Sequence, residues 1–380
     1  MVNNFLGTLE NIEHGTLVLV TPDSKTYTFF GSHEPKAVIY VKSWSVINNI
    51  AAKGDVGLAE SYRDSLFETD NLADLCILAL KNSHIIDKYL YGGSISGIIS
   101  QIMYYLRSNT IRGSRRNIHA HYDLGNGFYS LWLDPTMTYS SAIFKNDNES
   151  LLQAQHNKYD RIIERLGKSS GDLLEIGCGW GGFADRATQK QDLNIKGITI
   201  SDEQYKFARQ RLNNRANIVL EDYRRQKGKY DSIVSIEMFE AVGEKFWPVY
   251  FRKMKSLLKE KGQAIVQTIT IDEQYFDRYR KTGDMIRTFI FPGGMLPSVS
   301  KFKTAATTAN LKVVNNFHFG DNYVLTLKHW LASFEANIPK IKAVGFDEKF
   351  IRIWRFYLSV CIASFTVGRT NVIQAELVHA

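Results

Sequence analysis

An acidic residue and three evenly spaced glycines follow a short apolar run, and together they are the residues best placed to hold a ligand. The segment LLEIGCGWGG spans residues 173–182, with Glu175 two positions before the first glycine of a G-x-G-x-G pattern. Because glycine has no Cβ, the backbone can turn tightly there, and a ligand can lie against bare peptide at the carboxyl end of a strand. The pattern indicates a nucleotide-binding turn. The alternative is a strand-to-helix turn that binds nothing.

The spacing distinguishes this turn from one that binds a dinucleotide. A G-x-G-x-x-G loop frees backbone N–H groups for a pyrophosphate, whereas here a carboxylate precedes the glycines. Glu175 would therefore face a cation or an amine. The arrangement resembles motif I of the class I S-adenosylmethionine (SAM) methyltransferases, whose cofactor carries an ammonium, a carboxylate and a sulfonium.

The residues around the turn alternate between strand-like and helix-like patterns. Strands are expected at 172–177, 194–200, 217–221, 230–237 and 262–271, with helices at 181–190, 202–214 and 246–260. Such alternation predicts an α/β fold, in which a parallel Rossmann-like sheet carries helices on both faces and binds ligands at the carboxyl ends of its strands. Later helices are expected near 298–310, 321–337 and 347–366, and strands near 312–319 and 371–379.

The first part of the chain follows a different pattern. Short strands between residues 17 and 42 precede a helical period up to residue 106, so residues 1–106 are expected to form a small α+β domain. Its last stretch, 92–106, is an apolar helix candidate that either docks on lipid or packs in the core. Residues 107–116 carry four arginines and read as a basic linker that could contact headgroup phosphates. The catalytic domain would then be 117–380.

Composition limits the class of protein and its partners. The chain has 380 residues, a formal net charge of +8 and a pI of about 9.1. This charge favours anionic partners, either nucleic acid or an anionic membrane surface. Its three cysteines are odd in number and form no metal-binding pattern, so we expect reduced thiols and no metal. Without a signal-peptide pattern or a membrane-spanning apolar run, we expect a cytoplasmic protein, soluble or peripheral.

Five ordered motifs carry a more specific resemblance. They are NIHAHYDLGN at 117–126 with LDPTMTYSSAIF at 133–144, EIGCGWGG at 175–182, GITISDEQ at 197–204, SIEMFEAVG at 235–243 and FPGGMLPS at 291–298. With these motifs, residues 117–380 resemble the cyclopropane-fatty-acid-phospholipid synthases of the mycolic acid cyclopropane synthase superfamily. The N-terminal domain resembles them more loosely.

The resemblance implies a reaction and a location. The family transfers a methylene group from SAM to cis double bonds of unsaturated acyl chains in membrane phospholipids. The methyl group moves to an olefinic carbon and leaves a carbocation, and a base then removes a proton so that the cyclopropane ring closes. The expected partners are anionic phospholipids at the inner face of the membrane, and no nucleic acid. Because family members are often dimers, we also expect that a homodimer can form.

The resemblance assigns the cofactor to residues on both sides of the glycine turn. They are Tyr139 and Ser140 at the methionine end, Glu175, Gly177, Gly179 and Gly181 at the turn, Thr199, Ser201 and Gln204 around the ribose, and Tyr223 with Arg224 near the adenine. At the last two positions the family often has a tryptophan and a carboxylate. Ser201 or Asp202 would also cap the following helix, and for Asp202 we favour this capping role.

Glu240 is the expected base. It follows the apolar strand at 232–238, and a carboxylate among aromatic residues is unfavourable unless it has a function. In the family, a bound bicarbonate is thought to take the proton. The residues that would hold it here are Ser141, Glu240, Gln267, Ile269 through its backbone, and Tyr323. The rings of Tyr139, Phe144, Phe239 and Tyr323 would shelter the cation. Cys361 matches a cysteine once proposed for the family's active site, although such a buried thiol usually only packs.

Two positions depart from the family pattern. Ser141 stands where many members have cysteine, and Gln267 where they have histidine. A hydroxyl and an amide can still hold an anion, but a histidine relay to Glu240 is lost. A slower base favours products that keep the methyl group. Two alternatives therefore stand beside cyclopropanation: a SAM-dependent acyl methyltransferase that leaves a methyl branch, and a non-catalytic lipid- or SAM-binding protein.

Overall fold

The computed structural model describes residues 2–90, 110, 113 and 124–380. The chain forms two compact units, each drawn from separate stretches of sequence. The N-terminal unit takes residues 1–106, 277–292 and 338–369, and the catalytic unit takes residues 107–276, 293–337 and 370–380. The sequence predicted one continuous domain from residue 117 onward, whereas two later segments cluster with the N-terminal unit. Apart from Thr110 and Gly113, the expected linker at 107–116 and the apolar helix at 92–106 lie outside the described residues.

The N-terminal unit contains a four-stranded sheet in the order β2-β1-β3-β4. β1 (Thr16–Val20) pairs antiparallel with β2 (Thr26–Phe30) and parallel with β3 (Lys36–Val41), which pairs antiparallel with β4 (Phe67–Thr69). The helices of its first stretch are α1 (Val2–Leu9), α2 (Ser45–Lys53), α3 (Asp55–Arg63), α4 (Leu72–Lys81) and α5 (Ser83–Leu90). The change from strand to helix follows the change of period in the sequence.

A late helix completes this unit. α17 (Glu348–Thr366) packs against α3 and α4, and η4 (Ile286–Ile290) and α16 (Ile338–Ala343) belong to the same unit. Arg352 on α17 is buried, donates from Nε to the Tyr62 carbonyl at 2.5 Å and pairs with Glu68 at 3.0 Å. A buried charge needs such partners. The apolar face of α17 was visible in the sequence, but a helical period does not say which unit that face packs against.

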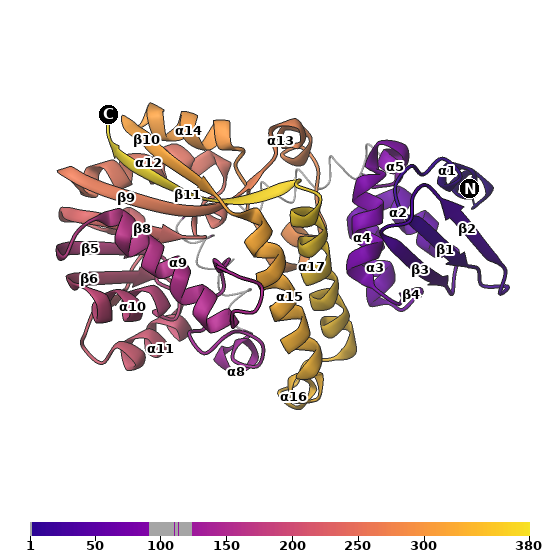
Figure 1. Cartoon of the computed structure of the whole chain (residues 1–380), viewed down its shortest axis with the longest axis horizontal. Helices are drawn as coiled ribbons and strands as arrows, with labels where there is room; N and C mark the ends of the chain where they lie inside the picture. Colours follow the sequence, from indigo (N-terminus) through magenta and orange to yellow (C-terminus); the bar gives the residue numbers. More distant parts are fainter. Residues whose placement is uncertain (1, 91–109, 111–112, 114–123) are drawn as a thin grey trace. The chain divides into compact units, whose positions relative to one another are not determined.

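The catalytic unit contains a mixed seven-stranded sheet in the order β10-β11-β9-β8-β5-β6-β7 (Figure 1). Five neighbouring strands are parallel: β5 (Ser170–Ile176), β6 (Asp192–Thr199), β7 (Asn217–Leu220), β8 (Tyr230–Ile236) and β9 (Leu258–Ile271). β11 (Thr370–His379) lies between β9 and β10 (Leu311–His318) and is antiparallel to both. The predicted parallel core is confirmed, and it places the carboxyl ends of β5, β8 and β9 side by side.

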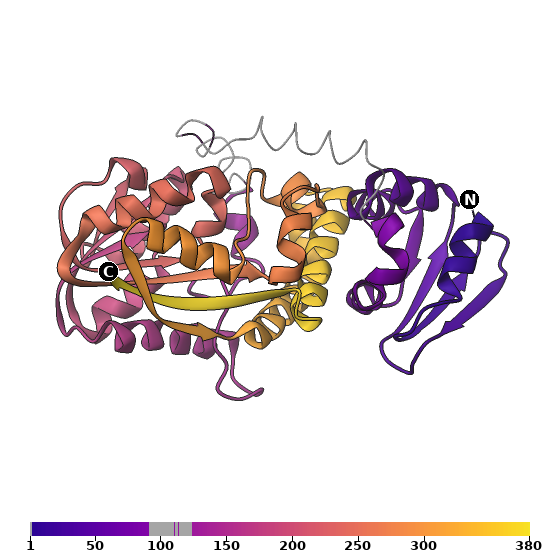
Figure 2. The same ribbon diagram turned by 90° about the horizontal axis from the view of Figure 1, so that it is seen from above.

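Helices cover both faces of this sheet (Figure 2). α9 (Leu151–Leu166), α10 (Gly182–Lys190) and α11 (Asp202–Leu212) share an apolar cluster with β5 and β6 that includes Ile162, Leu173 and Phe183. α12 (Trp247–Leu257) contacts β9 and α14 (Val299–Thr308). The unit also contains α8 (Asn126–Tyr129) and α15 (Gly320–Ala336), and α13 spans Glu273–Tyr279. Among the described residues, no helix combines the length and apolarity needed to cross a bilayer.

Candidate active site

The glycine turn has the geometry that its sequence predicts. Gly177, Gly179 and Gly181 have φ values of +80°, +53° and +83°, a region that side chains with a Cβ rarely adopt. A Cβ on Gly177 would lie 2.8 Å from Cγ of Met238, so the turn packs closely against the end of β8. A Cβ on Gly179 would meet no atom within 4 Å. Space therefore lies beside bare backbone at the carboxyl end of β5, where a ligand fits.

Glu175 lies at the end of β5, just before this turn. It is 3% exposed, and its Oε2 has no hydrogen-bond partner in the described part of the chain. Burial raises the pKa of this carboxyl well above its ordinary value. An unpartnered buried acceptor is costly, and the ammonium of a methionine-like ligand would satisfy it. The open space at Gly179 and this carboxylate together fit SAM.

Ser140, expected at the methionine end, accepts a hydrogen bond from a buried lysine that the sequence pattern did not single out. Lys158 on α9 is fully buried and donates from Nζ to Ser140 Oγ at 2.7 Å. Burial lowers the pKa of Lys158 to about 7, although the nearby carboxylates of Glu237 and Glu175 act against this shift. The neighbouring Tyr139 ring packs against Trp330, with centroids 5.2 Å apart. The sequence feature that could have identified Lys158 is its position, because it is a charged residue on the apolar face of the helical segment 151–166.

The residues expected around the ribose form one network after β6. Thr199 Oγ1 donates to Gln204 Oε1 at 2.8 Å, and the Gln204 backbone N–H donates to Ser201 Oγ at 3.3 Å. Ser201 is therefore the N-cap of α11, and Asp202 is its first helical residue. The capping role favoured for Asp202 is wrong, because the hydroxyl one residue earlier already takes the free N–H.

Tyr223 and Arg224, expected near the adenine, lie in the short helix η1 (Tyr223–Arg225). The Arg224 guanidinium is bound by Asp222, with Nε to Oδ1 at 2.8 Å and Nη2 to Oδ2 at 2.5 Å. The Tyr223 ring meets the edge of Tyr250 with centroids 5.5 Å apart, and burial raises the pKa of Tyr223 to about 12. Their contact with a ligand stays a prediction.

A second polar cluster lies at the ends of β8 and β9, and it centres on Glu237. Glu237 Oε1 accepts from the Ser141 backbone N–H at 2.9 Å and from Gln267 Nε2 at 2.8 Å. Glu237 Oε2 accepts from the Tyr323 hydroxyl at 2.6 Å. Three residues that the sequence singled out are thus brought together, but around a carboxylate that it did not. The sequence did contain a sign of this role, because Glu237 directly follows the buried strand β8 and lies inside the motif SIEMFEAVG at 235–243.

Glu240 lies beside this cluster, three residues further on. Its Oε1 accepts from the Ile269 backbone N–H at 2.5 Å, and its buried Oε2 has no partner among the described residues. Burial, together with the neighbouring charge of Glu237, raises the pKa of Glu240 to about 8. Burial raises the pKa of Glu237 as well, but the hydrogen bonds from Tyr323, Gln267 and the Ser141 N–H act against that rise. Glu240, which has fewer donors, is therefore the carboxyl that keeps the proton at neutral pH.

Replacing Glu240 with glutamine should remove part of the pH dependence of stability. A raised pKa means that the folded protein keeps a proton that the unfolded chain loses above pH 4.5, so this group's contribution to stability falls as pH rises to about 8. Glutamine cannot ionise. Between pH 6 and 8, wild type should lose roughly 2 kcal/mol more of its unfolding free energy than Glu240→Gln. Urea titrations at several pH values measure this, and parallel stability curves would contradict it.

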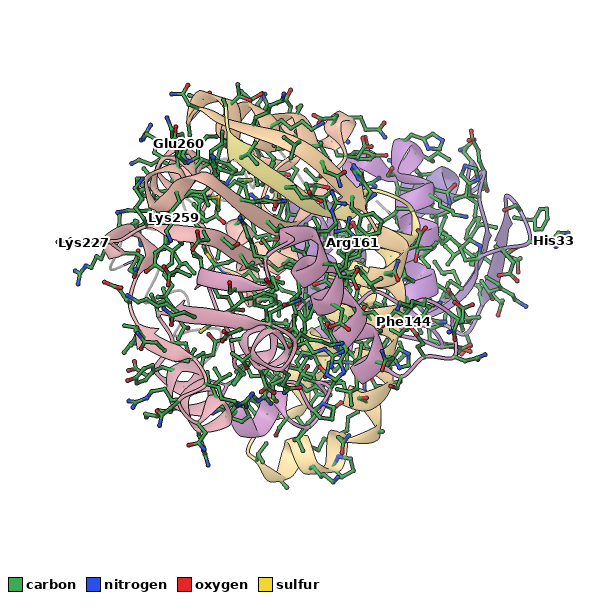
Figure 3. All side chains as sticks on the ribbon, turned by 60° about the vertical axis from the view of Figure 1, so that its left-hand side comes forward. His33, Phe144, Arg161, Lys227, Lys259 and Glu260 are labelled. Carbon is green, nitrogen blue, oxygen red and sulfur yellow. The ribbon has the colours of Figure 1, made fainter. Side chains whose placement is uncertain are left out.

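A chain of hydrogen bonds fixes the orientation of the Gln267 amide. Arg161 on α9, labelled in Figure 3, donates to Gln374 Oε1 at 2.5 Å, and Gln374 Nε2 donates to Gln267 Oε1 at 3.0 Å. A guanidinium can only donate, so each amide in the chain must turn its oxygen toward Arg161 and its NH₂ group away. The Gln267 NH₂ group therefore points at Glu237. Its second contact is the Ser141 carbonyl at 3.4 Å.

The remaining candidates have more ordinary surroundings. Phe239 is fully buried between Phe251 and Phe302, so it is a core residue. Phe144, also labelled in Figure 3, stacks on His329 with centroids 5.5 Å apart. Cys361 belongs to the N-terminal unit, not to the unit that holds the carboxylates. Burial raises the pKa of its thiol, which disfavours the reactive thiolate.

Known proteins share these features across most of the chain. The family described as mycolic acid cyclopropane synthetase matches residues 109–375. Tuberculostearic acid methyltransferase UfaA1 of Mycobacterium tuberculosis is 33% identical over 394 residues, covering 96% of this chain and 88% of that protein. The cyclopropane-fatty-acyl-phospholipid synthase of Escherichia coli is 34% identical over 344 residues, covering 87% and 84%.

A solved structure supports the assignment of the fold. The mycolic acid cyclopropane synthase CmaA1, complexed with SAH (S-adenosylhomocysteine) and CTAB, superposes with a TM-score of 0.65 at 32% identity. The match covers 69% of this chain and 97% of that one. The catalytic unit has the class I SAM methyltransferase fold, and the protein is a SAM-dependent methyltransferase. The chain belongs to the mycolic acid cyclopropane synthetase family.

Proposed function

We propose that this enzyme transfers a methylene group from SAM to the cis double bond of unsaturated acyl chains in membrane phospholipids, and so forms cyclopropane fatty acids. Family membership and the similarity to the E. coli phospholipid synthase support the proposal. The observation that carries it is the pairing of two acidic sites on adjacent parallel strands. Glu175 ends β5 beside the cofactor turn, and Glu237 follows β8. One site suits a cationic cofactor, and the other can accept a proton.

The residues divide the chemistry between them. When bound, SAM supplies a methyl group on an electrophilic sulfonium. Aromatic rings such as Tyr139 can stabilise the carbocation without trapping it, because they present electron-rich faces and no nucleophile. A proton acceptor in the cluster of Ser141, Glu237, Glu240, Gln267 and Tyr323 then allows ring closure. This acceptor is either bicarbonate, as the resemblance implies, or a carboxylate of the protein.

A second product deserves a direct test. The chain is similar to two proteins named as methyltransferases, tuberculostearic acid methyltransferase UfaA1 and, at 37% identity, a probable fatty acid methyltransferase of Pseudomonas putida. Their names favour an enzyme that leaves a methyl branch on the acyl chain. The same cofactor site and the same first step serve both outcomes, so only the product separates them.

We further propose that the enzyme works while peripherally bound to anionic membranes. The net charge of +8 and the four arginines between residues 107 and 116 support this. Homodimer formation belongs to the same proposal and rests on the family resemblance.

The test is a turnover assay with methyl-labelled SAM and vesicles of cis-unsaturated phospholipid. We expect label in the acyl chains and a cyclopropane ring in the NMR spectrum. A saturated methyl branch differs in mass by two hydrogens, whereas an exocyclic methylene has the same mass as the ring and needs NMR. Anionic vesicles at low salt should be better substrates than neutral vesicles or high salt. Binding of SAM without any labelled lipid would contradict the proposal.

A further inference from the structure

We propose that the carboxylate of Glu237 occupies the anion position of the active site and serves as the base, so that this enzyme needs no bicarbonate. The inference rests on the proposed function and names the proton acceptor within it. The donors that the family resemblance assigns to bicarbonate include Ser141, Gln267 and Tyr323, and all three donate to this one side chain.

In the described part of the chain, each donor of that set already has an acceptor within the protein. The Ser141 N–H and the Tyr323 hydroxyl donate to Glu237, and the Ile269 N–H donates to Glu240. The Ser141 hydroxyl donates to the Ala142 carbonyl at 3.1 Å. Gln267 gives one hydrogen to Glu237 and the other to the Ser141 carbonyl. An added anion would have to break these bonds and would then lie against a buried carboxylate.

The backbone at Glu237 also suggests selection for function. Its φ is +48°, in the left-handed region that disfavours residues with a Cβ. Glycine would be the unstrained choice at this position. Strain retained at a site lined with polar groups usually serves the site. Here the turn aims a carboxylate at three donors that come from distant parts of the chain.

The arrangement leaves Glu237 able to act as a base. Oε1 accepts two hydrogen bonds and Oε2 accepts one, so Oε2 keeps a lone pair. The neutral state of Glu240 at neutral pH leaves the negative charge of the pair on Glu237, which has the larger number of donors. The hydrogen-bond chain from Arg161 through Gln374 turns the NH₂ group of Gln267 toward Glu237, where it donates to Oε1.

The proton transfer balances without another reactant. The new methyl group of the carbocation gives a proton to Glu237 Oε2, and the electron pair of the broken C–H bond forms the C–C bond that closes the ring. Glu237 becomes a neutral carboxylic acid. It returns the proton to solvent after the product leaves.

Two substitutions at Glu237 separate the roles of shape and charge. Glu237→Gln keeps the volume but cannot accept the proton, so turnover should fall by at least about 100-fold, and no anion should restore it. Glu237→Gly empties the position and relieves the strained φ. This relief offsets part of the cost of leaving three buried donors without an acceptor, so the variant should still fold. Its three freed donors then form an anion site. Bicarbonate or formate should restore a substantial part of its activity, whereas chloride at equal ionic strength should not.

The decisive measurements use carbonate-depleted buffer, with labelled lipid product and anion binding followed separately. Wild type should be indifferent to added bicarbonate. Without any lipid, ¹³C-formate should bind to Glu237→Gly, but not to wild type or to Glu237→Gln. The inference is overturned if wild type loses activity on carbonate removal and regains it with bicarbonate, or if Glu237→Gln keeps more than about a tenth of wild-type turnover. If even wild type makes no lipid product, the proposed function fails, and the binding measurement still decides the inference.

Discussion

Glutamine in place of Glu175 should weaken binding of SAM by about 10- to 100-fold, because a charge-assisted hydrogen bond to a buried carboxylate is worth about 1.5–3 kcal/mol. Glutamine keeps the volume of the side chain and removes only its charge. The raised pKa of Glu175 adds a signature. A cationic ligand favours the ionised carboxylate, so binding should release a proton, and affinity should rise with pH up to that pKa.

Isothermal titration of both proteins with S-adenosylhomocysteine measures this loss. In wild type, the binding enthalpy should depend on the ionisation enthalpy of the buffer, and this dependence should vanish in Glu175→Gln. 5′-Methylthioadenosine, which lacks the amino acid part of the ligand, is the control. It should bind equally to both proteins. Equal weakening of both ligands would show that the substitution damages the fold of the site.

A matched pair of alanine substitutions should separate ligand binding from folding at the glycine turn. Gly179→Ala places its Cβ in the open space beside the turn, so the affinity for SAM should fall at least about tenfold, roughly 1.4 kcal/mol. Its cost to stability should be only that of a left-handed alanine, about 1–2 kcal/mol. Gly177→Ala carries the same backbone cost and adds a 2.8 Å contact with Met238. It should be the less stable of the two.

Thermal unfolding without ligand and titration with S-adenosylhomocysteine give the two quantities for each variant. Gly179→Ala should lose affinity for the ligand, and Gly177→Ala should be the less stable of the two variants. If Gly179→Ala bound the ligand like wild type, the open space beside it would not be the cofactor site.

The parts of the site that are local in sequence could be predicted. A glycine turn after an apolar strand depends on residues within one short segment, and the structure confirms the turn and the parallel strands around it. The sequence also narrowed the N-cap of α11 to Ser201 or Asp202, and the structure shows that it is Ser201. Ser201 and Asp202 are both good capping residues, and only the backbone geometry decides where α11 begins.

The carboxylate cluster could be predicted only in part, because its contacts join residues far apart in the chain. Ser141, Gln267 and Tyr323 were chosen by resemblance, but no pattern in the sequence says that they meet at Glu237. The same holds for Lys158, whose place in a buried helix face became clear only once α9 was packed on the sheet. The packing of α17 could not be predicted for a similar reason, since its partners α3 and α4 lie nearly three hundred residues earlier.

The position of β11 has a consequence for how the protein is made. β9 ends at Ile271, yet its neighbour in the sheet, β11, begins only at Thr370. During synthesis, β9 and β10 therefore leave the ribosome with the edges that pair with β11 still open, and these edges stay open until the chain has passed residue 379. Open strand edges pair readily with other chains. The nascent protein should thus depend most on chaperones during the interval in which β9 and β10 have been synthesised but β11 has not yet paired with them.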